Sequence, residues 1–528
     1  MTRVAIYDTT LRDGTQREGI SLSVADKLRV TRLLDDMGAA YIEGGWPGSN
    51  PKDVAYFEQV KSIPLKNAKI SAFGSTRRKH VDTDTDPNIR ALVDAQTPVV
   101  TVVGKTSMLH VTEVLQTTPD ENLRMIGDSL RYLKSLGKEV IYDAEHFFDG
   151  VQLDYEYGFD TLRAAVDAGV DWICLCDTNG GSLPWEVAKL VHTARELFPH
   201  VQIGIHTHND GELAVANSLA AVEAGATQVQ GTINGYGERC GNANLCSIIP
   251  DLQLKMGYDC LPDRDLRFLT LVSRSVAEIA NLAPDNHLAY VGKSAFAHKG
   301  GIHVAAMRRN IHSYQHIDPE LVGNEMRILV SDLSGQGNLL SKAEELGLDV
   351  GTAEAVKVLE EIKRLESQGF VFEGAEASVA VRLHRARIDY KPIFELVDFT
   401  VIVEERRGRG AQAQAIVKLD VDGEIILTAG EGNGPVNALD LALRKALINR
   451  YPQIADFQLA DYKVRILDGE NGTAATTRVM IETQSGPQRW STVGAGANII
   501  RASWLALADS VEYGLCIAAE QEQQEIQV

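Results

Sequence analysis

Three clusters of polar residues have the types and the spacing that metal-assisted chemistry requires. The first cluster, residues 8–16, reads Asp-Thr-Thr-Leu-Arg-Asp-Gly-Thr-Gln and includes Asp13. In the second, His206-Thr-His208, the alternation of side chains along an extended chain turns both imidazoles to the same side. We expect Asp13, His206 and His208 to bind one divalent ion, with Asn242 of the third cluster (Gly-Asn-Ala-Asn) as a weaker oxygen ligand. This mixed nitrogen and oxygen set suits Mn, Mg or Zn, and the sequence does not choose among them.

These clusters must be positioned by regular elements, and the first 260 residues alternate β-branched runs with stretches of helical period, such as residues 24–37. Strands are predicted at residues 4–7, 41–43, 69–72, 99–103, 140–142, 172–176, 202–205 and 228–230. Eight strand–helix units form either a (β/α)8 barrel or a doubly wound sheet. Because polar clusters directly follow predicted strands and no GxGxxG motif follows the first strand, we favour an α/β TIM barrel with the clusters at its mouth.

The pattern of predicted secondary structure changes twice in the remainder of the chain. Residues 261–370 are predicted to form a helical connector, and an alternation of period two returns after it. Residues 428–443 match residues 492–507 at an offset of 64 positions, and each copy predicts strands, a Gly-rich turn and a helix. We therefore expect a catalytic barrel over residues 1–260, the connector, and over residues 371–528 an α+β regulatory and dimerisation domain of two βββα repeats.

The composition excludes several classes of protein. Charged residues make up 23% and hydrophobic residues 44% of the 528 residues, which excludes a largely disordered chain. The net charge of −20 argues against binding to nucleic acid or to an anionic membrane, although it leaves room for a local basic pocket. No apolar run approaches the roughly 20 residues that cross a bilayer, no signal peptide is recognised, and six cysteines are too few for a disulfide scaffold. We expect a cytoplasmic protein.

Together the three clusters resemble the DRE-TIM metallolyases, and within them the 2-isopropylmalate, homocitrate and citramalate synthases. The duplicated module looks like the regulatory domain of that family, so the resemblance covers nearly the whole chain. Residues 42–52 (Ile-Glu-Gly-Gly-Trp-Pro-Gly-Ser-Asn-Pro-Lys) and 71–78 (Ser-Ala-Phe-Gly-Ser-Thr-Arg-Arg) are more similar to citramalate synthases. Isopropylmalate synthases usually read Ile-Glu-Ala-Gly-Phe-Pro at the first of these segments, so Gly44 and Trp46 are informative departures.

The resemblance implies an acyltransferase that condenses acetyl-CoA with pyruvate and hydrolyses the thioester, giving (R)-citramalate and CoA as the first step of a route to isoleucine. In such a reaction a divalent ion polarises the keto group of the acceptor. Arg12 would stabilise the developing alkoxide, unless it only forms a structural salt bridge. Glu145 is implied as the base that removes a methyl proton from acetyl-CoA, unless it is a solvated loop residue.

Other residues are carried over from the family onto matching positions. The residues implied to contact the substrates are Arg12, Asp13, Tyr142, Glu145 and Thr178. Thr178 could instead cap a helix. His303 and Tyr314 in the connector are implied to act in the active site of a neighbouring subunit, which requires a homodimer, although a connector histidine is otherwise usually structural.

The repeat also indicates where an effector could bind. Two equivalent Gly-rich turns, residues 430–434 and 494–498, each precede a predicted helix, where exposed backbone N–H groups can receive a carboxylate. We expect isoleucine to bind there and to inhibit the barrel at a distance. The glycines expected to contact it are Gly430, Gly432, Gly494 and Gly496. The alternative is that these glycines only permit tight turns in a dimerisation domain.

Three other functions remain open at this point. A 2-isopropylmalate synthase would take 2-oxoisovalerate in place of pyruvate. A lyase of the HMG-CoA lyase kind would run the carbon–carbon bond formation backwards, but such lyases generally end soon after the barrel. A non-catalytic amino-acid sensor would keep the barrel as a scaffold, and the intact Arg12, Asp13, His206 and His208 argue against that.

Overall fold

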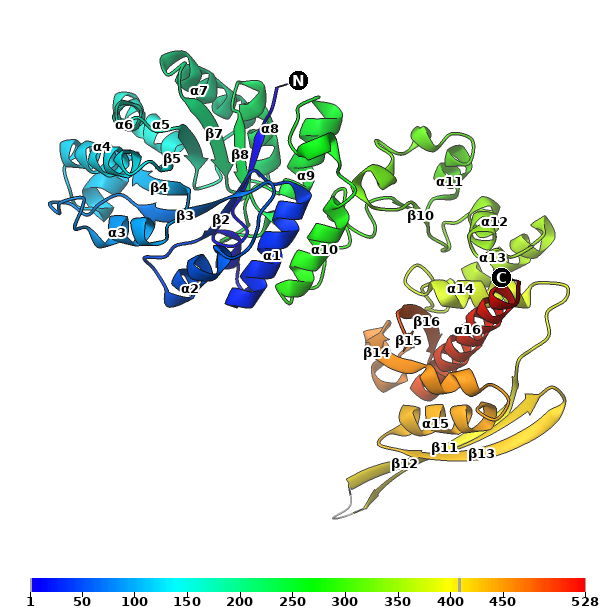
Figure 1. The fold of residues 1–528 in the computed structure, drawn as a ribbon. Helices are drawn as coiled ribbons and strands as arrows, with labels where there is room; N and C mark the ends of the chain where they lie inside the picture. The colour runs from blue at the N-terminus through cyan, green and yellow to red at the C-terminus, as the bar shows by residue number, and fades with distance from the viewer. Residues whose placement is uncertain (1, 407–409, 528) are drawn as a thin grey trace. The chain divides into compact units, whose positions relative to one another are not determined.

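The computed structural model describes residues 2–406 and 410–527, and the chain divides into two compact units (Figure 1). The first unit comprises Met1–Phe296 with Ile317–Glu325, and the second comprises Ala297–His316 with Met326–Val528. Among the described residues, none of the helices is both long and apolar enough to cross a membrane.

Eight parallel strands of the first unit close into a barrel in chain order, and β8 completes it by pairing with β1. The strands are β1 (Ala5–Asp8), β2 (Tyr41–Gly45), β3 (Lys69–Ser75), β4 (Val99–Lys105), β5 (Glu139–Glu145), β6 (Trp172–Asp177), β7 (Gln202–Thr207) and β8 (Gln228–Gly231). The predicted α/β TIM barrel is therefore confirmed, with its eight strands at the expected places.

Helices follow the strands and surround the barrel (Figure 1). They are α1 (Val24–Met37), α2 (Pro51–Val60), α3 (Pro87–Asp94), α4 (Pro119–Ser135), α5 (Phe147–Leu153), α6 (Tyr155–Asp167), α7 (Pro184–Leu197), α8 (Ala214–Glu223), α9 (Leu245–Pro250) and α10 (Leu269–Ile279). Ser23 and Asp26 form a capping box at the start of α1. Proline begins α2, α3, α4 and α7, where its missing N–H leaves no hydrogen bond unmade.

Alternation along the strands divides their side chains between two cores. Tyr7, Tyr41 and Ile141 belong to a cluster inside the barrel, together with Cys174 and Cys176. Side chains of the opposite parity pack between the strands and the helices and belong to the larger core. Further along each strand, side chains of the inward parity reach the mouth of the barrel, which is where a polar residue can face a cavity.

The second unit begins with a pair of two-residue strands and several helices. They are β9 (Ala297–His298), α11 (Gly301–Met307), β10 (Arg327–Ile328), α12 (Gln336–Glu345), α13 (Thr352–Ser367) and α14 (Glu376–Arg385). The strands β9 and β10 pair in parallel. The sequence predicts only helices here, so this ladder is a correction. Two residues per strand are too few to leave a periodic pattern in the sequence.

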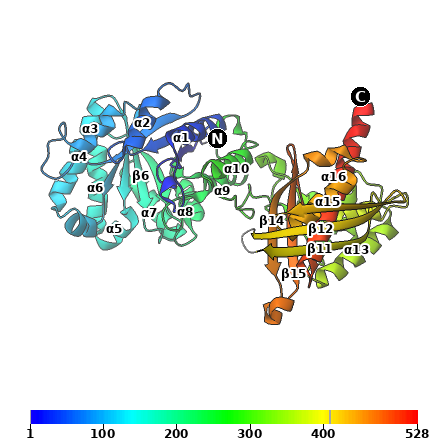
Figure 2. The same cartoon turned by 90° about the horizontal axis from the view of Figure 1, so that it is seen from below.

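The carboxyl-terminal module contains two three-stranded antiparallel sheets, each followed by a helix (Figure 2). The first repeat is β11 (Glu395–Arg406), β12 (Gly410–Val421), β13 (Glu424–Gly432) and α15 (Pro435–Leu447), and the second is β14 (Gln458–Ile466), β15 (Thr477–Ser485), β16 (Gln488–Gly496) and α16 (Ile499–Gln527). Because α15 packs on β12 and β13 while α16 packs on β15 and β16, the predicted pair of βββα repeats is confirmed.

The glycines of this module do not lie where the sequence placed them. Gly430 and Gly432 are in β13, and Gly494 and Gly496 are in β16, so they are strand residues and not turn residues. A Cβ atom on Gly494 would lie 2.0 Å from the carbonyl oxygen of Ala502 in α16. A strand so close to a helix backbone has no room for a side chain, which explains this glycine without an effector.

Candidate active site at the barrel mouth

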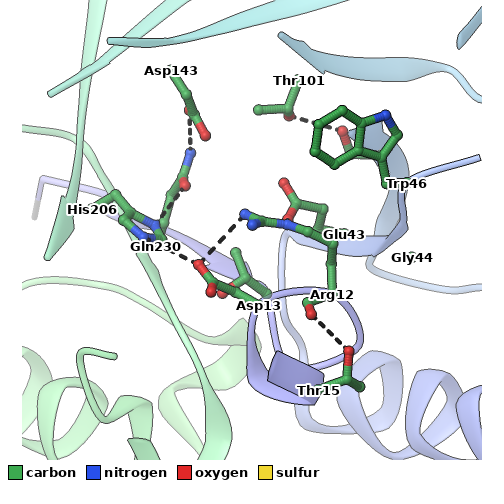
Figure 3. Close-up of polar contacts among 12 residues, drawn as sticks. Arg12, Asp13, Thr15, Glu43, Gly44, Trp46, Thr101, Asp143, His206 and Gln230 are labelled. Carbon is green, nitrogen blue, oxygen red and sulfur yellow. Dashed lines mark hydrogen bonds and ion pairs between the residues drawn. The ribbon is translucent and has the colours of Figure 1, made fainter. Parts of the chain in front are cut away.

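The loop after β1 folds around a buried carboxylate. Asp8 accepts hydrogen bonds from the backbone N–H and from the hydroxyl of Thr10, both at 2.9 Å. The hydroxyl oxygen of Thr10 accepts in turn from the backbone N–H of Ile233, which ties the loop to the segment after β8. Arg12 and Asp13 follow this turn (Figure 3). Both line the cavity at the barrel mouth.

The structure brings Asp13, His206 and His208 together. Asp13 Oδ2 lies 3.3 Å from His206 Nε2, which lies 3.2 Å from His208 Nε2. Burial and the nearby His206 lower the pKa of His208 to about 4. Burial alone would raise the pKa of Asp13, but Arg12 and His206 hold it well below its usual value. An anionic oxygen and two imidazole nitrogens therefore face one point, with one ligand atom from each residue within 4.8 Å of the others.

Asn242 lies next to this cluster because it forms an antiparallel bridge with His208. Its side-chain Nδ2 donates to the carbonyl oxygen of Tyr236 at 3.2 Å. Its Oδ1 is buried and accepts no hydrogen bond from any of the described residues. A buried amide oxygen without a donor is costly, and coordination of a cation would satisfy it.

Arg12 is held by a carboxylate and an aromatic ring. Its Nε donates to Glu43 at 2.5 Å, and its guanidinium carbon lies 3.8 Å from the centre of the Phe73 ring. Burial disfavours the charged guanidinium, but the carboxylates of Glu43 and Asp13 more than compensate, so the pKa of Arg12 is raised. Arg12 thus forms a salt bridge and also lines the cavity, and the two alternatives weighed from the sequence are not exclusive.

The cavity beside these groups has a volume of about 780 Å³. Its lining residues include Trp46, Phe73, Arg78, Lys79, Lys105, Glu145 and Thr178. The rings of Trp46 and Phe73 meet edge to face with centroids 5.3 Å apart, forming an apolar wall. A cavity with one apolar wall, several cations and a few carboxylates suits an anionic substrate that carries a small apolar group.

Glu145 and Thr178 face this cavity from the ends of β5 and β6. Glu145 forms an ion pair with Lys105. The Thr178 hydroxyl oxygen accepts a hydrogen bond from the backbone N–H of His146 at 2.8 Å. Thr178 is not the capping residue of α7, a position that Leu183 occupies, so its expected alternative role is not found.

Tyr142 is a correction to the predicted substrate contacts. It is fully buried in the core between the barrel and its helices, and it is absent from the cavity lining. Side chains alternate between the two faces of a strand. Because Tyr142 is three positions before Glu145 on β5, the two side chains point to opposite faces.

His303 and Tyr314 belong to the second unit, and the structure places them against each other. His303 lies in α11, and its ring stacks on that of Tyr314 with centroids 4.2 Å apart. Both side chains are exposed, as residues need to be if they are to reach another subunit.

Three polar residues at the barrel mouth were not selected from the sequence: Glu43, Asp143 and Gln230. Glu43 also accepts a hydrogen bond from the Tyr7 hydroxyl at 2.8 Å. Burial, with the nearby Glu43, raises the pKa of Asp143 to about 7. Asp143 lies two positions before Glu145 on β5, so both side chains point into the barrel. A polar residue at an inward-pointing position of a predicted strand was the signal by which the sequence could have identified it.

Comparisons with known proteins agree with this geometry. Residues 3–276 match the HMGL-like family, residues 290–369 match the homocitrate synthase post-HMGL domain-like family, and residues 373–515 match the LeuA allosteric (dimerisation) domain. The chain is 53% identical to the (R)-citramalate synthase of Synechocystis, covering 97% of this chain and 96% of the relative. It is 54% identical to that of Geobacter sulfurreducens, covering 98% of both.

A 2-isopropylmalate synthase of Methanocaldococcus jannaschii is less similar, with 31% identity over 96% of this chain and 94% of the relative. The resemblance inferred from the three polar clusters is therefore confirmed. Because the similarity extends over nearly the full length and includes the barrel with its site, the chain belongs to the HMGL-like family and, within it, to the (R)-citramalate synthases.

Proposed function

We propose that the chain condenses acetyl-CoA with pyruvate and hydrolyses the thioester, giving (R)-citramalate and CoA. The observation that carries this proposal is the identity of 53% and 54% to two (R)-citramalate synthases over nearly the whole chain. The apolar wall of Trp46 and Phe73 next to Arg12 supports an acceptor that carries an apolar group beside its anionic end.

A divalent ion fits the site. Asp13, His206 and His208 would hold it, and the buried Oδ1 of Asn242 would supply a further oxygen. One carboxylate, two imidazoles and an amide oxygen suit Mn, Mg or Zn. When bound, such an ion polarises the keto group of the acceptor.

The chain's own residues would hold the reactants and move the proton. Glu145 would take a proton from the methyl group of acetyl-CoA, with Lys105 orienting its carboxylate. The methyl carbon then bonds to the keto carbon of pyruvate, and Arg12 would donate hydrogen bonds to the oxygen on which negative charge develops. The Thr178 hydroxyl accepts from the His146 N–H, so its own proton is available for the pyruvate carboxylate. The alkoxide oxygen takes up a proton to become the tertiary hydroxyl. Water then adds to the thioester carbonyl, giving the new carboxylate and releasing CoA as its thiol.

The second unit would supply assembly and regulation. Its match to the LeuA allosteric (dimerisation) domain supports a homodimer and an allosteric effector. Within that dimer, His303 and Tyr314 would act in the active site of the other subunit. Isoleucine, the end product of the route that citramalate feeds, is the effector that we propose.

A panel of keto acids tests the proposed reaction. Purified full-length chain is assayed with acetyl-CoA and pyruvate, 2-oxobutyrate or 2-oxoisovalerate, and free thiol is measured. Pyruvate should show the highest kcat/KM, by about tenfold or more, since each methylene-sized misfit costs roughly 1–3 kcal/mol in a closed pocket. A higher kcat/KM for 2-oxoisovalerate would assign the chain to isopropylmalate synthesis, and no thiol release with any acceptor would favour a lyase or a sensor.

A further inference from the structure

A hydrogen-bonded series leads from the barrel wall to one of the two imidazoles. His206 Nδ1 lies 3.1 Å from Gln230 Oε1, and Gln230 Nε2 donates to Asp143 Oδ1 at 2.9 Å (Figure 3). The three residues come from β7, β8 and β5, and all three are buried. Asp143 lines the cavity and Gln230 does not, and neither is among the residues proposed above to hold the ion or the substrates.

The donor and the acceptor of each hydrogen bond in this series can be assigned. In the structure Gln230 Nε2 donates to Asp143 Oδ1, so the NH2 end of the Gln230 amide faces Asp143. The carbonyl end of Gln230 must then face His206, where it can only accept. His206 Nδ1 therefore carries the proton, and the lone pair of Nε2 is left facing Asp13 and His208.

We propose that Gln230 and Asp143 are positioning residues that hold His206 in the tautomer and ring orientation needed for metal binding. The proposal rests on the metal site proposed above. His208 has no such support, because its buried Nδ1 has no hydrogen-bond partner among the described residues. One imidazole is therefore fixed before an ion arrives, and the other adjusts to it.

The same strand provides a matched control. Gln228 lies two residues before Gln230 on β8, is also fully buried, and shares its parity. Neither amide atom of Gln228 has a hydrogen-bond partner within the part of the chain that the structure describes. Replacing Gln228 with methionine therefore changes a buried amide of the same size without touching His206.

The test measures metal affinity in the full-length chain and not activity. Mn²⁺ is titrated into metal-free protein in competition with a fluorescent chelator, for wild type, Gln230→Met, Gln230→Glu, Asp143→Asn and Gln228→Met. Gln230→Met and Asp143→Asn should weaken Mn²⁺ binding about 10–100-fold, because the amide or the imidazole can then adopt the wrong orientation. Gln230→Glu keeps an acceptor for His206 but removes the NH2 donor to Asp143 and sets two carboxylates side by side, so it too should bind Mn²⁺ more weakly than wild type. The Gln228→Met protein should match wild type.

Thermal unfolding of the metal-free proteins separates positioning from folding, since a loss of affinity with an unchanged midpoint is the expected result. Unchanged Mn²⁺ affinity in both Gln230→Met and Asp143→Asn overturns the proposal. So does an equal loss in Gln228→Met and Gln230→Met. A wild-type chain that binds no Mn²⁺ overturns the metal site itself, whereas wild-type binding with unaffected variants overturns only the positioning role.

Discussion

The guanidinium carbon of Arg12 lies 3.8 Å from the centre of the Phe73 ring, so the ring covers one face of the cation. The Nε edge of the same group is occupied by Glu43. One terminal nitrogen, Nη2, also lies 3.5 Å from Asp13 Oδ2. The remaining N–H groups of the guanidinium are left for a substrate, and the guanidinium is held in one orientation. A lysine could supply the charge but neither the stacking nor the fixed fork.

Replacing Arg12 with lysine should therefore lower kcat by about 10²–10³-fold, as loss of a preorganised donor to a developing oxyanion does. The KM for acetyl-CoA should change much less. Steady-state kinetics with both substrates measure the two effects separately. Arg131→Lys, at an exposed position of α4, is the control and should behave as wild type. An Arg12→Lys enzyme with unchanged kcat would contradict the proposed role.

His208→Ala should abolish most activity and weaken the binding of a divalent ion. This variant keeps only Asp13 and His206, because the substitution removes one of the three converging ligand atoms. Bound metal can be measured by elemental analysis after gel filtration, in parallel with thiol release. The matched control is His192→Ala, because His192 is exposed on α7. Full activity of His208→Ala without metal would disprove the assignment.

Mixing two inactive variants tests the proposed exchange of residues between subunits. Arg12→Ala removes a barrel residue, and His303→Ala removes a residue of the second unit. If His303 acts in the partner's barrel, a hybrid dimer has one site with both changes and one intact site. Up to about a quarter of wild-type activity should then return, because half of the dimers are hybrids and half of their sites are intact.

The control for this mixture is each variant mixed with itself under the same exchange conditions, with light scattering to establish the dimer. An active monomer, or no recovery when the subunits demonstrably exchange, would refute the arrangement.

Asp8 predicts a pH dependence of stability. Burial raises the pKa of Asp8 from 3.8 to about 7, hydrogen bonds from Thr10 oppose the shift, and the charge of Glu43 adds to it. Because the folded-state pKa is the higher one, this group's stabilising contribution is complete below about pH 4 and is lost as the pH rises through about 7.

Asp8→Asn cannot ionise, so its free energy of unfolding should rise relative to wild type by roughly 1–3 kcal/mol between about pH 5 and pH 8. Urea unfolding of both chains at the two pH values measures the difference. If the free energy of unfolding changes with pH by the same amount in both proteins, Asp8 does not cause the pH dependence.

Substitutions at two glycines of β16 distinguish a role in packing from a role in effector binding. A Cβ atom on Gly494 would lie 2.0 Å from the Ala502 carbonyl oxygen, whereas one on Gly496 would meet nothing within 4 Å. Gly494→Ala should therefore destabilise the second unit, by about 1–3 kcal/mol, and Gly496→Ala should not. Calorimetric titration of isoleucine, leucine and valine into wild type and Gly496→Ala then tests the proposed effector. Absence of binding by all three amino acids would leave the module as a dimerisation unit.

Much of the site could be predicted from the sequence because its chemistry is local. Asp13 follows the first strand, His206 and His208 share a parity, and these relations hold in any parallel barrel. The βββα repeat could be recognised because both copies keep the same order of elements. The error at Tyr142 was one of parity, since a residue three positions before Glu145 on a strand points to the opposite face.

Other features were decided only by the tertiary structure. The sequence suggests turns at the glycines of β13 and β16. Only the approach of the following helices shows that Gly430, Gly432 and Gly494 allow close packing. Gln230 and Asp143 lie 87 positions apart in the chain, and neither stands in a recognisable motif. They meet His206 because β5, β7 and β8 belong to one closed barrel, and the side chains inside a barrel become neighbours only through long-range strand pairing that no local pattern encodes.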